Sequence, residues 1–250
     1  NQSEYGTIRI YSDFTTLNIQ AQRYSTEFVD KVSTFINSAV EAMRTLIIVP
    51  QDSQNLIIKV CEVSIQIDVT IVTSGMPADL IVFPYIFDRL SNRDKLLNVD
   101  VYGTHCVLDE ITGRPKGVII GISETIDLNK RNWKEYYEAR VLHALTHSMV
   151  FNPISLFDKF IDKNGNKIPL ENTLERLFDT EEKYRVISPR VVKTAQAYFN
   201  CPSIVGVPLE SFGLVDPSIP SNHWDARWMH TDLMTAEDSI KSVLSEITLA

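Results

Sequence analysis

The chain has 250 residues, 44% of them hydrophobic, and a formal net charge of −8. This length can bury a large core, as one domain or as two closely packed subdomains. The acidic balance argues against nucleic-acid binding, which needs a basic face. No apolar run approaches the roughly 18–20 residues of a membrane-spanning helix. The first residues lack the pattern of a signal peptide, so we expect a mature or trimmed form with no transmembrane segment.

The first half of the chain predicts an α/β arrangement. Residues 7–14 alternate in polarity like a strand, and residues 56–72, rich in Ile and Val, predict two strands or one long bent strand. Residues 26–46 carry apolar side chains at helical spacing, which is typical of a helix packed on a core. That stripe consists of Phe28, Val32, Phe35, Ile36, Ala39, Val40 and Met43.

A hairpin and a long helix follow. Residues 78–83 predict a short buried strand. Residues 105–109 and 117–122, joined by a turn at Thr112-Gly113-Arg114-Pro115, predict a hairpin. We therefore expect a twisted mixed sheet backed by helices, with a helix over residues 132–150 under its lower edge.

The second half predicts helices and loops. Within residues 162–167 the glycine is fourth, whereas a calcium-binding EF-hand loop needs it sixth, so Asn164-Gly165 predicts a hairpin turn. Ser188-Pro189 predicts the start of a helix that runs to about residue 199. Residues 205–223 predict a long loop. A last helix is expected from residue 235, and it reaches the C-terminus without a cap, so we expect the natural chain to continue.

The three cysteines are Cys61, Cys106 and Cys201. They are too few for a disulfide framework, and their odd number leaves at least one thiol free or paired elsewhere. Their spacing excludes a zinc finger and a C-x-x-C redox motif. The cellular compartment does not follow from the cysteines alone.

The most informative stretch is His143-Ala144-Leu145-Thr146-His147. It is the zinc-protease pattern H-E-x-x-H with alanine in place of glutamate. Histidines at i and i+4 lie on one face of a helix, one turn apart, so both imidazoles can reach one metal ion. The glutamate of the pattern accepts a proton from water activated by zinc, and Ala144 cannot do this. The spacing alone is weak support for a metal site, because two of five histidines fall four apart by chance fairly often.

Separated segments around this helix share the order of one family's motifs. They are Leu108-Asp109 with Gly113-Arg114-Pro115, His143 to His147, Phe157-Asp158-Lys159-Phe160, Tyr198-Phe199-Asn200-Cys201-Pro202-Ser203, His223-Trp224, and Asp232-Leu233-Met234-Thr235. The chain resembles the leishmanolysin (gametolysin-type) zinc metallopeptidases, a branch of the metzincins. Any one motif is weak, whereas the ordered set is specific.

The resemblance implies a fold and a site. The fold is metzincin-like, with an N-terminal subdomain over residues 1–150 that carries the active-site helix and a helical, loop-rich C-terminal subdomain over residues 151–250. It implies Zn²⁺ bound by His143, His147 and, after a long insertion, His223, above Met234 of a methionine turn. Three imidazoles leave the fourth zinc position open, as in catalytic sites.

Two histidines, His105 and His230, lie outside these motifs. His105 and His230 are not expected to bind the metal, and His230 is expected at the surface or as support for a ligand. The resemblance implies a place outside the cell or on its surface, although the low cysteine count weakens this expectation.

The departures from the family pattern concern catalysis. Ala144 replaces the general base, and Glu138, five residues before His143, is rotated away from the zinc-facing side. Val150 stands where the family has the glycine that ends the helix in a left-handed conformation, so the helix must end differently. The dense cysteines of the family are also mostly absent.

Three functions remain open at the level of sequence. The one we favour is a catalytically inactive binding or structural protein that holds a protein or peptide in its substrate cleft, with a possible place in a larger assembly. The alternative is an active zinc metalloendopeptidase captured as a Glu-to-Ala variant. The third is a relic of the fold that has lost its metal.

Overall fold

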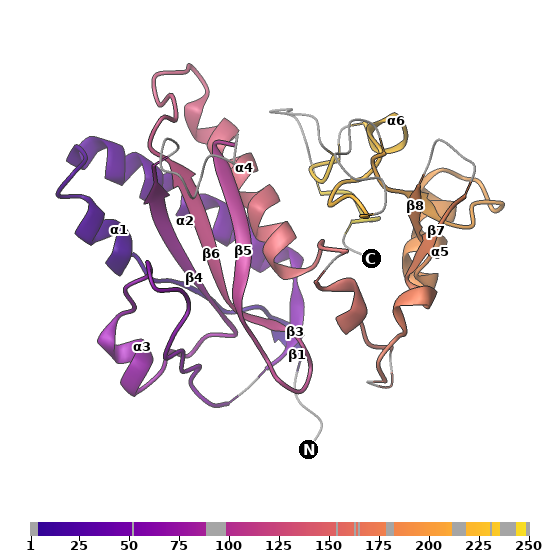
Figure 1. Ribbon diagram of the computed structural model, residues 1–250, viewed down its shortest axis with the longest axis horizontal. Coiled ribbons are helices and arrows are strands. Elements are labelled where there is room, and N and C mark those ends of the chain that lie inside the picture. Colours follow the sequence, from indigo (N-terminus) through magenta and orange to yellow (C-terminus); the bar gives the residue numbers. More distant parts are fainter. Residues whose placement is uncertain are drawn as a thin grey trace. The chain divides into compact units, whose positions relative to one another are not determined.

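The computed structural model describes residues 5–51, 53–88, 99–153, 155–162, 164, 166–178, 183–211, 219–230, 232–235 and 244–248 (Figure 1). The chain divides into two compact units, Asn1–Met149 and Val150–Ala250. Each unit has its own apolar core.

The centre of the first unit is a four-stranded mixed sheet of order β2-β4-β6-β5. Strands β2 (Ile10–Ser12), β4 (Leu80–Phe87) and β6 (Pro115–Ser123) run parallel, and β5 (Val101–Leu108) pairs antiparallel with β6. The expected mixed sheet, the buried strand and the hairpin are confirmed. Gly113, with φ of 70°, allows the chain to reverse between β5 and β6.

Both faces of the central strand β4 are buried, which explains its continuous apolar sequence. Alternate residues point to opposite faces of a strand. Leu80 and Val82 therefore join the larger core cluster, whereas Ile81 and Phe83 join a second cluster on the other face.

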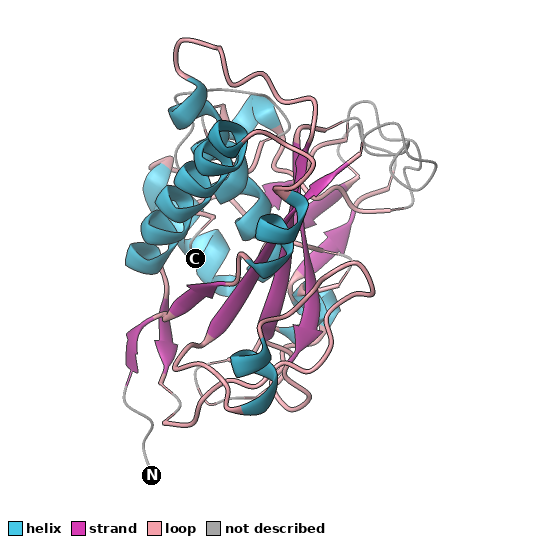
Figure 2. Ribbon diagram, turned by 90° about the vertical axis from the view of Figure 1, so that its left-hand side faces the viewer, coloured by secondary structure: helices cyan, strands magenta, loops and turns pink. Residues whose placement is uncertain are grey.

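Helices cover the face of the sheet that bears Leu80 and Val82 (Figures 1 and 2). Helix α2 (Thr26–Leu46) matches the expected helix, and the Ser25 hydroxyl caps it by accepting a hydrogen bond from the Phe28 N–H at 3.1 Å. All of the predicted stripe is buried except Phe28, which is partly buried. Helix α1 (Thr15–Gln20) lies beside β4. Helix α4 (Trp133–Met149) packs against α2.

The strands predicted over residues 56–72 are wrong. This segment is irregular and ends in the short helix α3 (Val69–Thr73). Its buried members are Ile58, Ile65 and Ile71, which reach the second core cluster, whereas Val63 is 98% exposed. Such unequal spacing of buried residues fits neither the strand period nor a continuous buried strand.

Long-range contacts hold this segment in place of a strand ladder. The Asp68 N–H donates to the Asp13 carboxylate at 2.9 Å, and the Gln66 N–H donates to the Thr16 hydroxyl at 2.8 Å. A disulfide joins Cys61 to Cys106 on β5.

The single strand expected at residues 7–14 is two short strands. Strand β1 (Tyr5–Thr7) pairs antiparallel with β3 (Ile48–Pro50), whereas β2 joins the central sheet. The Ile8 N–H donates to the Ile47 carbonyl between these pairings.

The second unit contains a sheet that the sequence did not predict. Strands β7 (Leu174–Arg176), β8 (Tyr184–Val186) and β9 (Val207–Pro208) form an antiparallel sheet. Strands of two or three residues are too short to show a polarity period, and β9 lies within the expected loop at residues 205–223. Residues 212–218 of that loop lie outside the described residues.

Short helices complete the second unit. They are the 3₁₀ turns η1 (Phe157–Lys159) and η2 (Leu170–Asn172), and the helices α5 (Pro189–Tyr198) and α6 (Ala226–Met229). The expected helix after Ser188-Pro189 is confirmed as α5, although the Ser188 side chain makes no capping bond.

Two further expectations for the second unit have different outcomes. The turn expected at Asn164-Gly165 lies partly outside the described residues, because Gly165 is not among them, and the described residues Ile161 and Lys167 form an antiparallel bridge. Residues 246–248 form a turn, so the helix expected at the C-terminal end is wrong there. The part of that helix over residues 236–243 lies outside the described residues.

Candidate metal centre

Helix α4 is anchored at its N-terminal end by a buried aromatic residue. The Tyr137 hydroxyl accepts a hydrogen bond from the Asp127 N–H at 2.9 Å, and the ring packs on Phe35 of α2 with centroids 5.5 Å apart. Burial raises the pKa of Tyr137 to about 12. This residue therefore remains a neutral anchor for the helix that carries the histidine pair.

The first two candidate ligands lie side by side on α4. The Nε2 atoms of His143 and His147 are 2.9 Å apart, and the ring centroids are 4.5 Å apart with planes at 80°. Two imidazole nitrogens on one tetrahedral Zn²⁺, each at 2.0–2.1 Å, are about 3.3 Å apart. The pair therefore fits a shared zinc ion with a small adjustment of the two rings.

Ala144 lies on the neighbouring, core-facing side of α4. It is 1% exposed and belongs to the larger apolar cluster of the first unit. Its carbonyl accepts a hydrogen bond from the Ser148 hydroxyl at 2.8 Å. The methyl group at the general-base position packs in the core and can accept no proton.

The end of α4 differs from the glycine ending of the family pattern. The helix ends at Met149, and Val150 follows it. Among the described non-glycine residues, positive φ occurs at Asn200 and His230, so Val150 is not left-handed. The expectation that this helix ends without the left-handed residue is confirmed, because a β-branched side chain disfavours that conformation.

The third candidate ligand, His223, belongs to the second unit, where backbone hydrogen bonds hold it on both sides. Its carbonyl accepts a hydrogen bond from the Glu210 N–H at 2.9 Å, and the next residue, Trp224, donates its N–H to the Met234 carbonyl at 2.9 Å. The His223 N–H donates to the Ser221 hydroxyl at 3.1 Å. The ligand segment therefore lies between the extension of β9 and the methionine turn.

The methionine turn is buried and is closed by an aspartate. Met234 is fully buried in the core of the second unit. The Asp232 carboxylate accepts a hydrogen bond from the Met234 N–H at 2.6 Å. In the sequence, Asp232 stands out only as part of the motif Asp232-Leu233-Met234-Thr235. Its position two residues before the turn, typical of an aspartate that bonds its own backbone, could have indicated this role.

The other two histidines lie elsewhere. His105 is on β5 opposite Val118, burial lowers its pKa, and its Nδ1 atom has no hydrogen-bond partner among the described residues. His230 is exposed at the end of α6, with φ of 36°.

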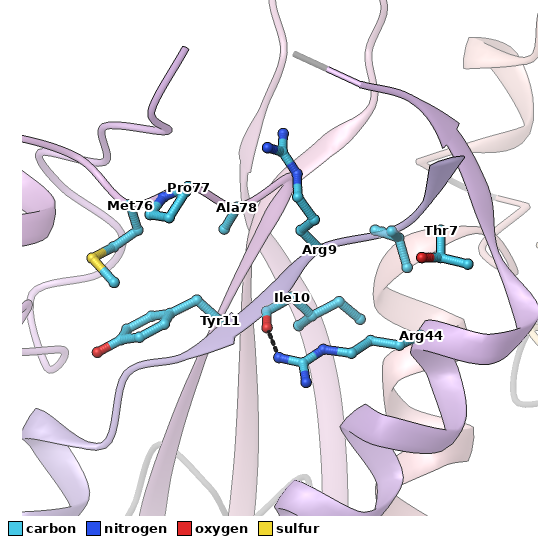
Figure 3. A pocket seen from close by; sticks show the side chains of 9 residues that line it. Thr7, Arg9, Ile10, Tyr11, Arg44, Met76, Pro77 and Ala78 are labelled. Atoms are coloured by element: carbon cyan, nitrogen blue, oxygen red, sulfur yellow. Dashed lines mark hydrogen bonds between the residues drawn. The ribbon is translucent and has the colours of Figure 1, made fainter. Parts of the chain in front are cut away.

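A separate pocket of about 410 Å³ lies along β2 (Figure 3). It is lined by residues 7–11, Arg44 and residues 76–78. Its two cations are engaged in the fold, since Arg44 donates to the Ile10 carbonyl and to Glu41, and Arg9 pairs with Asp79. The described residues that line this pocket include no histidine, cysteine or carboxylate.

The three cysteines form one disulfide and one free thiol. Cys61 and Cys106 are paired, and Cys201 is outside any disulfide, which agrees with the expectation that at least one thiol is free or paired elsewhere. Within the part of the chain that the structure describes, no helix is long and apolar enough to cross a membrane.

Comparison with known proteins identifies the family. Residues 26–250 match the family model described as leishmanolysin (Peptidase_M8). A leishmanolysin-like peptidase of Drosophila pseudoobscura pseudoobscura is 35% identical over 179 residues, which cover 60% of this chain and 26% of that protein. A ciliated left-right organizer metallopeptidase of Xenopus laevis is 28% identical over 146 residues, covering 56% of this chain and 19% of that protein. This chain thus spans about a quarter or less of the length of these relatives, and it belongs to the leishmanolysin family of metallopeptidases.

Proposed function

We propose that this domain is a catalytically inactive member of the leishmanolysin family that binds a protein or peptide without cleaving it. The observation that carries the proposal is Ala144, a buried methyl group one residue after the first histidine of an otherwise fitting pair. Hydrolysis at a zinc site needs a group that accepts a proton within hydrogen-bond reach. Glu138 lies five residues before His143, more than one helical turn away, and does not replace the missing base.

The proposed metal is Zn²⁺, held by His143, His147 and His223. The support is the donor set of three imidazoles, the type of ligand that catalytic zinc sites prefer, and the family to which the chain belongs. When bound, zinc acts as a Lewis acid that polarises a carbonyl group. The chain's own contribution would be to fix the ligands and to hold the bound peptide at the site.

The proposed binding surface is the outer edge of β5. This strand is the last in the order of the central sheet, and each of its eight residues is partly exposed. An extended peptide can add to such an edge through main-chain hydrogen bonds, with pockets for alternate side chains. The bound chain would then run along the sheet above α4, which packs against β5.

We place the protein outside the cell or on its surface. Disulfides persist in oxidising compartments, and the Cys61–Cys106 disulfide supports this location. A role within a larger assembly is part of the same proposal.

Restoring the base tests the proposal. With added zinc and a quenched peptide library, the unaltered chain should give no turnover above background. Ala144→Glu should then exceed Ala144→Gln by a factor of about 10²–10⁴, the usual contribution of a general base. The glutamine variant is the matched control, because it has the same size and cannot accept the proton.

Two results would count against the proposed inactivity. One is zinc-dependent cleavage by the unaltered chain that disappears in His147→Ala. The other is failure of the unaltered chain to retain any peptide from the same library on an affinity column, since the binding role predicts retention without cleavage.

A further inference from the structure

A buried carboxylate joins two segments of the second unit, the methionine turn and residues 245–248. Asp232 is 2% exposed, and its Oδ1 atom accepts a hydrogen bond from the Met234 N–H at 2.6 Å. Its Oδ2 atom accepts hydrogen bonds from the Ser245 N–H at 3.0 Å and from the Thr248 hydroxyl at 2.8 Å. Burying a charged group is costly unless its hydrogen bonds are satisfied, so three donors to one carboxylate mark a specific arrangement.

The same network reaches the residue that follows His223. The Thr248 oxygen, which donates to Asp232, accepts a hydrogen bond from the Trp224 ring N–H at 2.7 Å. Trp224 is 1% exposed, and its ring packs edge-on against Phe151 with centroids 4.6 Å apart. Its main-chain N–H donates to the Met234 carbonyl. Both the side chain and the backbone of Trp224 are therefore fixed through Asp232.

We propose that Asp232 is a positioning residue that holds His223 in its metal-binding orientation through Trp224 and Met234. This inference rests on the proposed zinc site. The carboxylate bonds the methionine turn directly, and it orients the Thr248 hydroxyl that holds the Trp224 ring. Without it, the backbone on the C-terminal side of His223 loses its fixed position, and the imidazole loses its preorganisation for zinc.

The chemistry requires a carboxylate at this position. An asparagine can keep the acceptor for the Met234 N–H, but its NH₂ group cannot accept from the Ser245 N–H or from the Thr248 hydroxyl. With the amide turned the other way, the Met234 N–H loses its acceptor instead, so Asp232→Asn breaks at least one of the three bonds in either orientation at nearly constant volume. Thr248→Val removes the hydroxyl that links the Trp224 ring to Asp232 and leaves the bonds from the Met234 N–H and the Ser245 N–H in place, whereas Thr248→Ser keeps the hydroxyl.

Zinc affinity and the visible spectrum of the Co²⁺ form measure the effect directly, without any assay of turnover. Partners that orient metal ligands contribute about 10–100-fold in affinity. We expect Asp232→Asn and Thr248→Val to weaken zinc binding at least 10-fold and to change the Co²⁺ absorption, whereas Thr248→Ser restores both. The matched control is Thr173→Val, which removes a buried hydroxyl of the same unit that donates to the Leu170 carbonyl at 2.9 Å. It should change zinc affinity less than twofold.

A further variant separates the failure of this inference from the failure of the proposed site. If His223→Ala binds zinc as tightly as the unaltered chain, the three-histidine site itself is wrong. If His223→Ala weakens binding while Thr248→Val behaves like Thr173→Val, the positioning role of the Asp232 network is overturned. The comparison of Thr248→Val with Thr248→Ser decides the question even if Asp232→Asn does not fold.

Discussion

A single carboxylate, Asp79, ties β2 to the start of β4 in the first unit. Arg9 donates to it from Nε and Nη2, each at 3.0 Å, and from its main-chain N–H at 2.9 Å. The Arg114 guanidinium lies 3.4 Å away. Burial alone raises the pKa of Asp79, but the hydrogen bonds from Arg9 outweigh it and hold the pKa below the ordinary value of 3.8. The carboxylate therefore remains charged inside the fold because its donors replace water.

Replacing Arg9 and replacing Asp79 should lower the free energy of unfolding by different amounts. Arg9→Met leaves a buried charge that keeps only the main-chain N–H of residue 9 and the more distant Arg114, and should cost about 3 kcal/mol of unfolding free energy. Asp79→Asn leaves Arg9, whose side chain is 35% exposed and can be hydrated, and should cost about 1.5 kcal/mol. Urea unfolding at pH 7 measures both values. Equal costs would contradict this account.

The ion pair between Arg9 and Asp79 makes the free energy of unfolding depend on pH. A folded pKa below the unfolded value contributes stability above pH 3.8, and this stability is lost as the pH falls through the lower, folded value. The stability difference between the unaltered chain and Asp79→Asn should therefore narrow below about pH 4, and the difference should be constant from pH 6 to pH 8.

At the scale of elements, the approach of β5 to α4 positions the histidine pair. Gly103 of β5 makes this approach possible, because a methyl group there would lie 2.2 Å from the Ala144 carbonyl oxygen and 2.5 Å from the Ser148 hydroxyl. Both contacts are shorter than van der Waals distances, and one involves helix backbone that cannot rotate away. The strand that forms the proposed binding edge is thus in direct contact with the turn of α4 between His143 and His147.

Gly103→Ala should push the strand and the helix apart. We expect a loss of about 1–3 kcal/mol in unfolding free energy, as for other overpacked sites, together with weaker zinc binding. Gly6→Ala is the control, because the added methyl group would meet only the flexible Gln51 side chain, at 3.2 Å. Calorimetry and a zinc titration of the two variants test this. Unchanged zinc affinity in Gly103→Ala would show that the contact between β5 and α4 does not set the geometry of the histidine ligands.

At the scale of the molecule, the Cys61–Cys106 disulfide fixes the irregular cover of the sheet. It joins positions 45 residues apart and holds residues 57–68 against the face that bears Ile81 and Phe83. A loop of this length loses conformational entropy in the unfolded chain, which corresponds to about 4 kcal/mol of stabilisation. A segment without a strand ladder depends on such a link more than a strand does.

The double variant Cys61→Ser with Cys106→Ser should lose about 2–5 kcal/mol of stability. Adding a reductant should lower the stability of the unaltered chain by a similar amount and leave the double variant unchanged. Cys201→Ser is the control, because Cys201 is outside any disulfide and should show the full effect of the reductant. Unfolding in urea with and without reductant gives all of these values.

Elements with a regular period were predictable from the sequence alone. Helix α2, the hairpin of β5 and β6, and the pairing of His143 with His147 follow from the spacing of residues within one element. The prediction of strands at residues 56–72 was wrong because apolar content alone does not show which residues pack on this segment. Ile58, Ile65 and Ile71 are buried by the second core cluster of the sheet, which lies far away in the sequence.

By itself, the sequence determined the family, the histidine pair and the alanine that follows its first histidine, because each is a matter of residue type at a fixed spacing. Only the tertiary structure decided that the sheet's second face is covered by a disulfide-linked loop, and that Asp232 links the methionine turn to Trp224. The reason is physical. A periodic pattern indicates which side of one element is buried. The structural role of a carboxylate or a thiol depends instead on the hydrogen-bond donors and the partner cysteine that folding brings to it.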